Sequence, residues 1–67
     1  MMLVNAGVNI NSATKKELMS LKGIGEKTAI AIMEYRKAHK FKLLSELTKI
    51  KGVGKKKLQM LKGKIEL

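Results

Sequence analysis

Two short glycine-containing segments are the parts of this chain whose residue types and spacing suggest chemistry. Residues 21–29 read LKGIGEKTA and residues 50–58 read IKGVGKKKL, so each is apolar-Lys-Gly-apolar-Gly followed by a helix start. Glycine permits positive φ and close approach of a ligand. The first N–H groups of a helix have no intrahelical partner, and with the helix dipole they form an anion site. The pattern predicts two phosphate sites at a fixed separation.

The two segments belong to an internal repeat with an offset of 29 residues, which places Gly52 after Gly23. A repeat at a fixed offset indicates a duplicated structural unit. Two copies indicate a duplicated hairpin and not a solenoid. The same offset relates Glu17 to Glu46, Leu18 to Leu47, Leu21 to Ile50, Lys22 to Lys51 and Lys27 to Lys56.

The composition points to a polyanionic partner. The 67 residues carry 15 Lys and Arg, five acidic residues and one His, which gives a net charge of +10. Such a charge suits nucleic acid, an anionic membrane or an acidic protein. The chain has no Cys, so it has no disulfide framework or thiolate site. It shows no carboxylate pair, nucleophile–base pair or ligand cluster, so we expect it not to be an enzyme by itself.

Four helices are predicted. Thr14 and Glu17 have the spacing of a capping box, which predicts a helix that runs to about Ser20. The apolar run 29–33 predicts a long helix that other elements largely enclose. The later helices are predicted at 26–39, 44–49 and 55–62, the last stopped by Gly63.

Several apolar and aromatic residues are predicted to build a small core. The alternation in residues 8–11 (VNIN) predicts an extended lead-in whose whole role is to lay Val8 and Ile10 on the core. Flexible methionines fill gaps in small cores, so they are expected inside. The other predictions are a buried Phe41, a core Tyr35 ring with its hydroxyl at the surface, a plain surface His39, and core positions for Leu58, Leu61, Met19, Met33 and Met60.

This ordered set of residues resembles the doubled helix-hairpin-helix DNA-binding domain, in the form found in the bacterial competence protein ComEA family. The resemblance implies an all-α fold with two helix-hairpin-helix motifs in a pseudo-twofold arrangement, a SAM-like or RuvA domain 2-like doubled hairpin. It implies one domain over 1–67, with units at about 14–39 and 43–62. The residues that carry it are 8–11, Ala13, Thr14, Glu17, Leu18, 21–29, Tyr35, Arg36, Phe41, Lys42 and 50–56.

The chain departs from the family pattern at three positions. Lys22 stands where the family often has Pro, no Gly precedes Phe41, and Leu43 stands where a Ser or Thr usually caps the third helix. None of these positions lies in the glycine pairs. The departures therefore concern the shape of the middle linker more than the phosphate sites.

The resemblance also implies the binding residues. In the family, backbone N–H groups of each turn and of the next helix hold a phosphate, and turn carbonyls sometimes hold a monovalent cation. No other cofactor or metal is expected. The sites carried over to this sequence are Lys22, Gly23, Ile24, Gly25 and Lys27 for the first turn, and Lys51, Gly52, Val53, Gly54, Lys55, Lys56 and Lys57 for the second.

Duplex DNA is the expected partner, and no small-molecule substrate is expected. Backbone donors read no base edges, so binding should be independent of sequence, as in a competence DNA receptor. Single strands usually need aromatic platforms, and only Tyr35 and Phe41 are available. The alternative is an accessory or protein-interaction module of a DNA-repair nuclease. Membrane adhesion needs a basic amphipathic helix, whereas the lysines here gather at turns.

The setting depends on which of these functions is correct. A competence receptor would lie in the cell envelope or periplasm, and a repair module in the cytoplasm. Contact with a membrane would require an anchor outside these residues. Other DNA-uptake or repair proteins are further candidate partners.

The two turns differ in charge. Residues 22–28 hold two lysines and one glutamate, a net charge of +1, whereas residues 51–57 hold four lysines, a net charge of +4. Three lysines of the second turn lie in the first helical turn, where cations oppose the helix dipole. We expect the second turn to contribute more to DNA binding.

Overall fold

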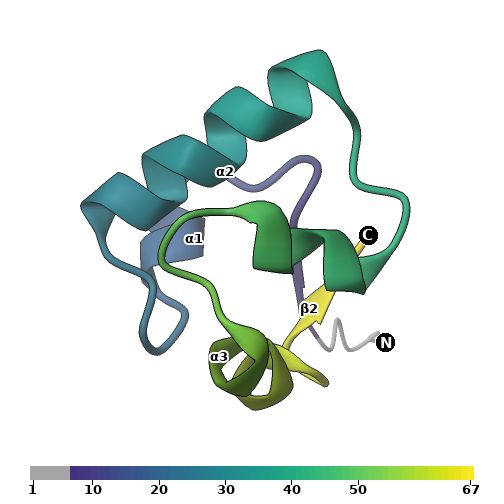
Figure 1. Cartoon of the computed structure of the whole chain (residues 1–67). Coiled ribbons are helices and arrows are strands. Elements are labelled where there is room, and N and C mark those ends of the chain that lie inside the picture. The colour runs from purple at the N-terminus through teal and green to yellow at the C-terminus, as the bar shows by residue number, and fades with distance from the viewer. Residues whose placement is uncertain (1–6) are drawn as a thin grey trace, which may run out of the picture.

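The computed structural model describes residues 7–67 and consists of short helices around one core, with a two-stranded ladder at the chain ends (Figure 1). The predicted all-α architecture is confirmed, with this small ladder as an addition. The elements in order are β1 (Val8–Asn9), α1 (Lys15–Met19), α2 (Glu26–Ala38), the 3₁₀ helix η1 (Leu44–Lys49), α3 (Lys55–Leu61) and β2 (Ile65–Glu66).

The core follows the 29-residue repeat. Five pairs of apolar residues at this offset are all at most 7% exposed. Equivalent positions of both units therefore pack into one shared core, which is the pseudo-twofold arrangement that the repeat predicts. The pairs are Leu18 with Leu47, Leu21 with Ile50, Ile24 with Val53, Ala29 with Leu58, and Ile32 with Leu61.

The start of α1 is the predicted capping box. The Glu17 N–H donates to Thr14 Oγ1 at 3.1 Å, and the Thr14 N–H donates to Glu17 Oε1 at 2.8 Å. These two bonds satisfy donors that the helix itself leaves unpaired. The helix ends at Met19, and Leu18 is its fully buried residue.

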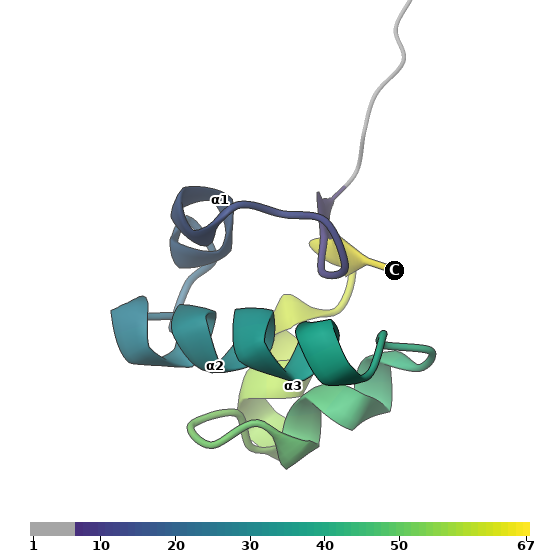
Figure 2. The same ribbon diagram turned by 90° about the horizontal axis from the view of Figure 1, so that it is seen from above.

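Helix α2 is the longest helix, as predicted, but the expectation that it is enclosed is wrong. Ala29 and Ile32 are buried, whereas Ile30 is 42% exposed. Residues three apart share a helix face, so the positions of Ala29 and Ile32 turn Ile30 outward. Figure 2 shows α2 running across the middle of the view, with α1 on one side of it and η1 and α3 on the other.

The expectation that methionines fill the core is also wrong for two of the three. Met19 is 41% exposed and Met60 is 50% exposed, while Met33 packs against the core as a partly buried side chain. On α3, Leu58 and Leu61 occupy the inner face, which leaves Met60 on the outer one.

The lead-in pairs with the C-terminal tail, which the sequence did not predict. Strands β1 and β2 are parallel, with Val8 opposite Ile65. The Val8 N–H donates to the Lys64 carbonyl at 2.9 Å. Gly7 lies so close to this tail that a Cβ there would be 2.7 Å from the Lys64 carbonyl oxygen. The two ends of the described chain are thereby tied together.

Asn11 ties the lead-in to the middle linker. Its Nδ2 donates to the Phe41 carbonyl at 3.0 Å, and the Phe41 N–H donates to Asn11 Oδ1 at 2.8 Å. Arg36 Nη1 donates to the Ile10 carbonyl at 2.9 Å. The lead-in therefore does more than lay Val8 and Ile10 on the core. Phe41 is buried as predicted, and its ring stacks on Tyr35 with a centroid distance of 4.6 Å.

Glu46 replaces the missing Ser or Thr cap of η1. Leu43 has no side-chain acceptor, but Glu46 Oε2 accepts the N–H groups of Lys42 and Leu43 at 3.0 Å each. Its Oε1 accepts the Tyr35 hydroxyl at 3.1 Å. The Lys42 N–H, followed by the Leu43 N–H, the Tyr35 hydroxyl and the charge of Lys49, lowers the pKa of Glu46, although burial opposes this shift.

Replacing Glu46 by Gln should destabilise the protein in a pH-dependent way. The folded pKa of Glu46 lies below its usual value, so its contribution is full above the unfolded pKa and disappears as pH falls through the folded pKa. Urea unfolding of wild type and Glu46→Gln should therefore differ clearly at pH 7, and the difference should shrink at pH 3. A difference of the same size at both pH values would contradict this role.

Candidate nucleic-acid interface

The first glycine of each pair makes the turn. Gly23 has φ 86° and Gly52 has φ 96°, in the left-handed region that favours glycine. Each turn is closed by the same bond, because the Ile24 N–H donates to the Leu21 carbonyl at 3.1 Å and the Val53 N–H donates to the Ile50 carbonyl at 3.0 Å.

The predicted sites therefore need one correction. Ile24 and Val53 are each only 4% exposed, and their N–H groups are used inside the turns. Their side chains hold the turns in the core. These two N–H groups are therefore not available as donors to a ligand.

The second glycine of each pair is not required by the fold. Gly25 and Gly54 have φ −92° and −96°, which any residue adopts. They are the N-cap residues of α2 and α3 without a side-chain cap bond, and a Cβ at either would meet nothing within 4 Å. The first intrahelical bonds run from the Ala29 N–H to the Gly25 carbonyl and from the Leu58 N–H to the Gly54 carbonyl. Open space thus lies at two helix starts, whose first N–H groups have no intrahelical acceptor.

The two turns lie at the same end of the molecule (Figures 1 and 2), and each contacts the helix start of the other unit. A Cβ at Gly23 would be 3.3 Å from Lys57 Cε, and a Cβ at Gly52 would be 2.9 Å from Thr28 Oγ1. These contacts exchange under the 29-residue offset, because Gly23 corresponds to Gly52 and Thr28 to Lys57. Each unit therefore packs its third helical residue against the turn of the other unit.

A groove runs between the start of α2 and the second turn. It has a volume of about 380 Å³ and brings together the predicted residues Lys27, Lys51 and Gly52. Its other lining residues, Thr28 and Ala31, were not predicted. The repeat itself could have indicated Thr28, because it is the counterpart of Lys57.

Most of the lysines predicted for the two turns are exposed, and one further lysine lies beside the first turn. Five of the site lysines are exposed, and Lys57 is partly buried against the first turn. Lys15, which was not predicted, pairs with Glu26 at 2.9 Å and so offsets the carboxylate of the first turn. The ion pair reduces the difference in net charge between the two turns. The exposed predicted lysines are Lys22, Lys27, Lys51, Lys55 and Lys56.

The part of the chain that the structure describes offers little for metal or membrane chemistry. Within residues 7–67, no group of three His, Cys or acidic side chains could hold a metal ion. In the same range, every helix is too short or too polar to span a bilayer.

Comparison with known proteins shows where related sequences occur. The family described as the helix-hairpin-helix motif matches residues 4–66. The ComE operon protein 1 of Bacillus subtilis is 39% identical over 59 residues, which are 87% of this chain and 29% of that protein.

Two further relatives have similar identity. The endonuclease/exonuclease/phosphatase family domain-containing protein 1 of Danio rerio is 42% identical over 57 residues, which cover 84% of this chain and 10% of the relative. An uncharacterized protein of Haemophilus influenzae is 40% identical over 65 residues, which cover 94% of this chain and 58% of the relative. The chain thus spans only part of each of these proteins.

The two glycines of one turn should respond differently to the same substitution. Gly52→Ala should lower the free energy of unfolding by about 1 to 2 kcal/mol, because it places a Cβ in the left-handed region and against Thr28. Gly54→Ala meets open space at an ordinary φ and should change the free energy by less. Urea unfolding of both variants tests this, and equal losses would show that the second glycine is also structural.

Proposed function

The chain belongs to the helix-hairpin-helix family, and on this premise we propose that it binds double-stranded DNA without sequence preference, through backbone phosphates held at its two turns. The observation that carries the proposal is the open space at Gly25 and Gly54. Neither position needs glycine for its φ or for its neighbours, whereas an approaching phosphate needs that space.

The donors available to a phosphate are backbone N–H groups. Those of residues 25–27 and 54–56 lie at helix starts, before the first intrahelical bonds. Backbone donors fix position on the duplex and read no base edges, which supports sequence-independent binding. Two such sites at one end of a rigid domain suit the regularly spaced phosphates of a duplex. The surrounding lysines add long-range attraction.

We also propose a role of the competence-receptor type for the protein that contains this domain. The similarity to the ComE operon protein 1 of Bacillus subtilis supports it. The chain covers only 29% of that relative, so the role concerns DNA capture by this domain and not the whole relative. By itself, the domain would be a binding module and not an enzyme.

The alternative is a docking module of a nuclease, and the second turn argues against it. A protein-docking face there would expose apolar residues, but Val53 is 4% exposed and the neighbouring Lys51, Lys55 and Lys56 are all exposed. The relatives named for an endonuclease/exonuclease/phosphatase family match this chain over about a tenth of their length. The similarity to these relatives is therefore limited to their helix-hairpin-helix segment.

A monovalent cation at a turn remains a proposal that the residues fit. The Leu21 and Ile50 carbonyls each accept one N–H from within their turn. A carbonyl oxygen has two lone pairs, so each keeps acceptor capacity for a cation. Such an ion would add positive charge beside the phosphate.

Adding a methyl group to both second glycines should weaken DNA binding without unfolding the protein. Gly25→Ala with Gly54→Ala should weaken duplex binding about tenfold or more, which is the scale of losing one or two charge-assisted hydrogen bonds. Fluorescence anisotropy with two duplexes of unrelated sequence and an oligo-dT strand provides the measurement. The two duplexes should bind equally, and the single strand should bind more weakly.

Three outcomes would overturn the proposal. They are unchanged binding by the double variant, strong discrimination between the duplexes, and a clear preference for the single strand. The matched control is Ser12→Ala, an exposed position far along the chain from both turns.

The lysines of the two turns should contribute unequally. Each lysine that contacts a phosphate adds about one unit to the slope of log K against log salt. Replacing Lys55, Lys56 and Lys57 by Gln should lower this slope by about two to three, while replacing Lys22 and Lys27 should lower it by at most about two. The triple variant should fold about as stably, because removing cations that oppose the dipole of α3 offsets the packing that Lys57 makes against the first turn.

Salt titrations of duplex binding, together with urea unfolding, measure both effects. If the first pair of lysines matters as much as the second set, side-chain charge does not distinguish the two turns. A triple variant that unfolds would show that these lysines are structural.

A further inference from the structure

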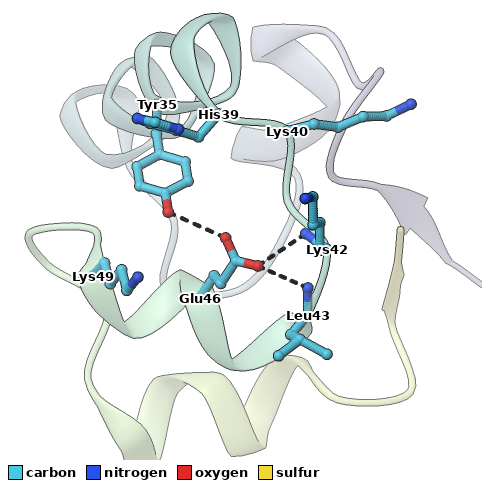
Figure 3. Close-up of a pocket in the computed structure, with 7 residues that line it drawn as sticks. All are labelled: Tyr35, His39, Lys40, Lys42, Leu43, Glu46 and Lys49. Carbon is cyan, nitrogen blue, oxygen red and sulfur yellow. Dashed lines mark hydrogen bonds between the residues drawn. The ribbon is translucent and has the colours of Figure 1, made fainter.

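A second basic concavity lies at the C-terminal end of α2, away from the first turn, and its η1 wall ends at Lys49, directly before the second turn. It has a volume of about 600 Å³ and is formed by the end of α2, the linker 39–43 and η1 (Figure 3). The first turn leads into the N-terminus of α2, and Tyr35 and His39 of the concavity lie at its C-terminal end. Thirteen residues at 1.5 Å each separate the two ends by about 20 Å.

The concavity carries unbalanced positive charge. Lys40, Lys42 and Lys49 line it, and within residues 7–67 none of them forms an ion pair. Its single carboxylate, Glu46, is occupied by the Tyr35 hydroxyl and by two backbone N–H groups. A concave surface lined by one sign of charge focuses its field on an approaching ion of opposite sign.

The helix-hairpin-helix architecture does not require these lysines. Going back 29 positions from Lys42 and Lys49 gives Ala13 and Ser20, so the first unit builds the same structure without either cation. Glu46, by contrast, has a counterpart in Glu17, and both cap a helix. The capping group is thus common to both units, and the basic side chains are particular to the second.

The remaining walls are one exposed aliphatic side chain, Leu43, and the rings of Tyr35 and His39. Leu43 is 62% exposed, and the His39 ring lies beside Tyr35 with a centroid distance of 5.8 Å. Figure 3 shows the Tyr35 ring and the Glu46 carboxylate at the centre of the concavity, with lysines on both sides. Such a surface offers point charges for a phosphate and apolar contact for the adjoining sugar.

We propose that this concavity binds the backbone of a second DNA segment, so that one domain bridges two duplexes. The inference rests on the proposed function of the turns. A phosphate at the start of α2 lies beyond that end of the helix axis, whereas Tyr35, His39, Lys40 and Lys42 lie at the other end of α2 and only Lys49 adjoins the second turn. The concavity faces a different partner at the other end of α2, and a second polyanionic duplex matches its charge and apolar walls.

Bridging can be measured with two duplexes that carry different labels. One duplex is attached to beads through biotin, the other is fluorescent, and the domain is added below saturation. The wild type should retain the fluorescent duplex on the beads. Replacing Lys40, Lys42 and Lys49 by Gln should abolish most retention and lower the salt slope of bridging by about two to three. Because Lys49 adjoins the second turn, single-duplex binding is compared with the Lys40→Gln, Lys42→Gln double variant, whose anisotropy affinity for one duplex should change by less than about threefold.

The matched control replaces Lys16, Lys62 and Lys64 by Gln. All three lysines are exposed and line neither concavity. Their replacement removes the same net charge as the replacement of Lys40, Lys42 and Lys49. This variant should bridge as the wild type does. Sedimentation without DNA should show the same oligomeric state for all three proteins, so that self-association does not imitate bridging.

Four outcomes would overturn the proposal. Wild type that binds one duplex without bridging would show that no second site exists. Equal loss of bridging in both triple variants would show a general charge effect. A parallel loss of single-duplex binding and of bridging in the concavity variant would show that the concavity binds the first duplex. Tighter capture of poly-glutamate than of the second duplex would make it a site for acidic protein. If the wild type binds no duplex at all, the proposed function of the turns fails first.

Discussion

The structure depends on two aliphatic side chains, Ile24 and Val53, that anchor the turns in the core. Each is flanked by two glycines, is 4% exposed and donates its own N–H inside the turn. The positive φ of Gly23 and Gly52 lets the chain reverse around the anchored side chain. A loop that would otherwise be mobile is thereby held in one conformation, with the helix start directed outward.

The same anchoring explains how two turns become one surface. Both aliphatic residues enter one shared core built from repeat-related pairs, which couples the positions of the two turns. Thr28 and Lys57 then pack each helix start against the opposite turn. A 67-residue domain has little stability in excess, since small domains bury a modest share of their surface. Because the core residues Ile24 and Val53 also hold the two turns in place, the domain positions both turns without contacts beyond those of its core.

Much of this could be predicted from the sequence, because the signals are local. Thr14 with Glu17 predicts a helix start, paired glycines predict a turn, and the offset of 29 residues predicts that the second unit copies the first. The helix bounds agree with the structure within about two residues. The repeat and the family resemblance also indicated the lysines and glycines of the candidate site, which stay predictions, although neither indicated that the Ile24 and Val53 N–H groups are used inside the turns.

The features that escaped prediction depend on long-range contacts or on the choice between helix faces. The alternation in residues 8–11 predicts an extended lead-in but does not identify a partner strand, so the pairing of Val8 with Ile65 was not predicted. The Asn11 side chain bonds the backbone of Phe41 across thirty positions. An apolar run such as 29–33 does not say which residue faces outward, and Ile30 does. Lys15 reaches Glu26 only because α1 and α2 pack together.

The central claim is that both helix starts hold phosphates through backbone N–H groups at the same time. Amide chemical shifts of the ¹⁵N-labelled domain, followed during titration with a short duplex, test it most directly. The amides of residues 25–27 and 54–56 should shift most and with one common midpoint. Shifts confined to one turn, two separate midpoints, or lysine side-chain effects without movement of these amides would contradict the account.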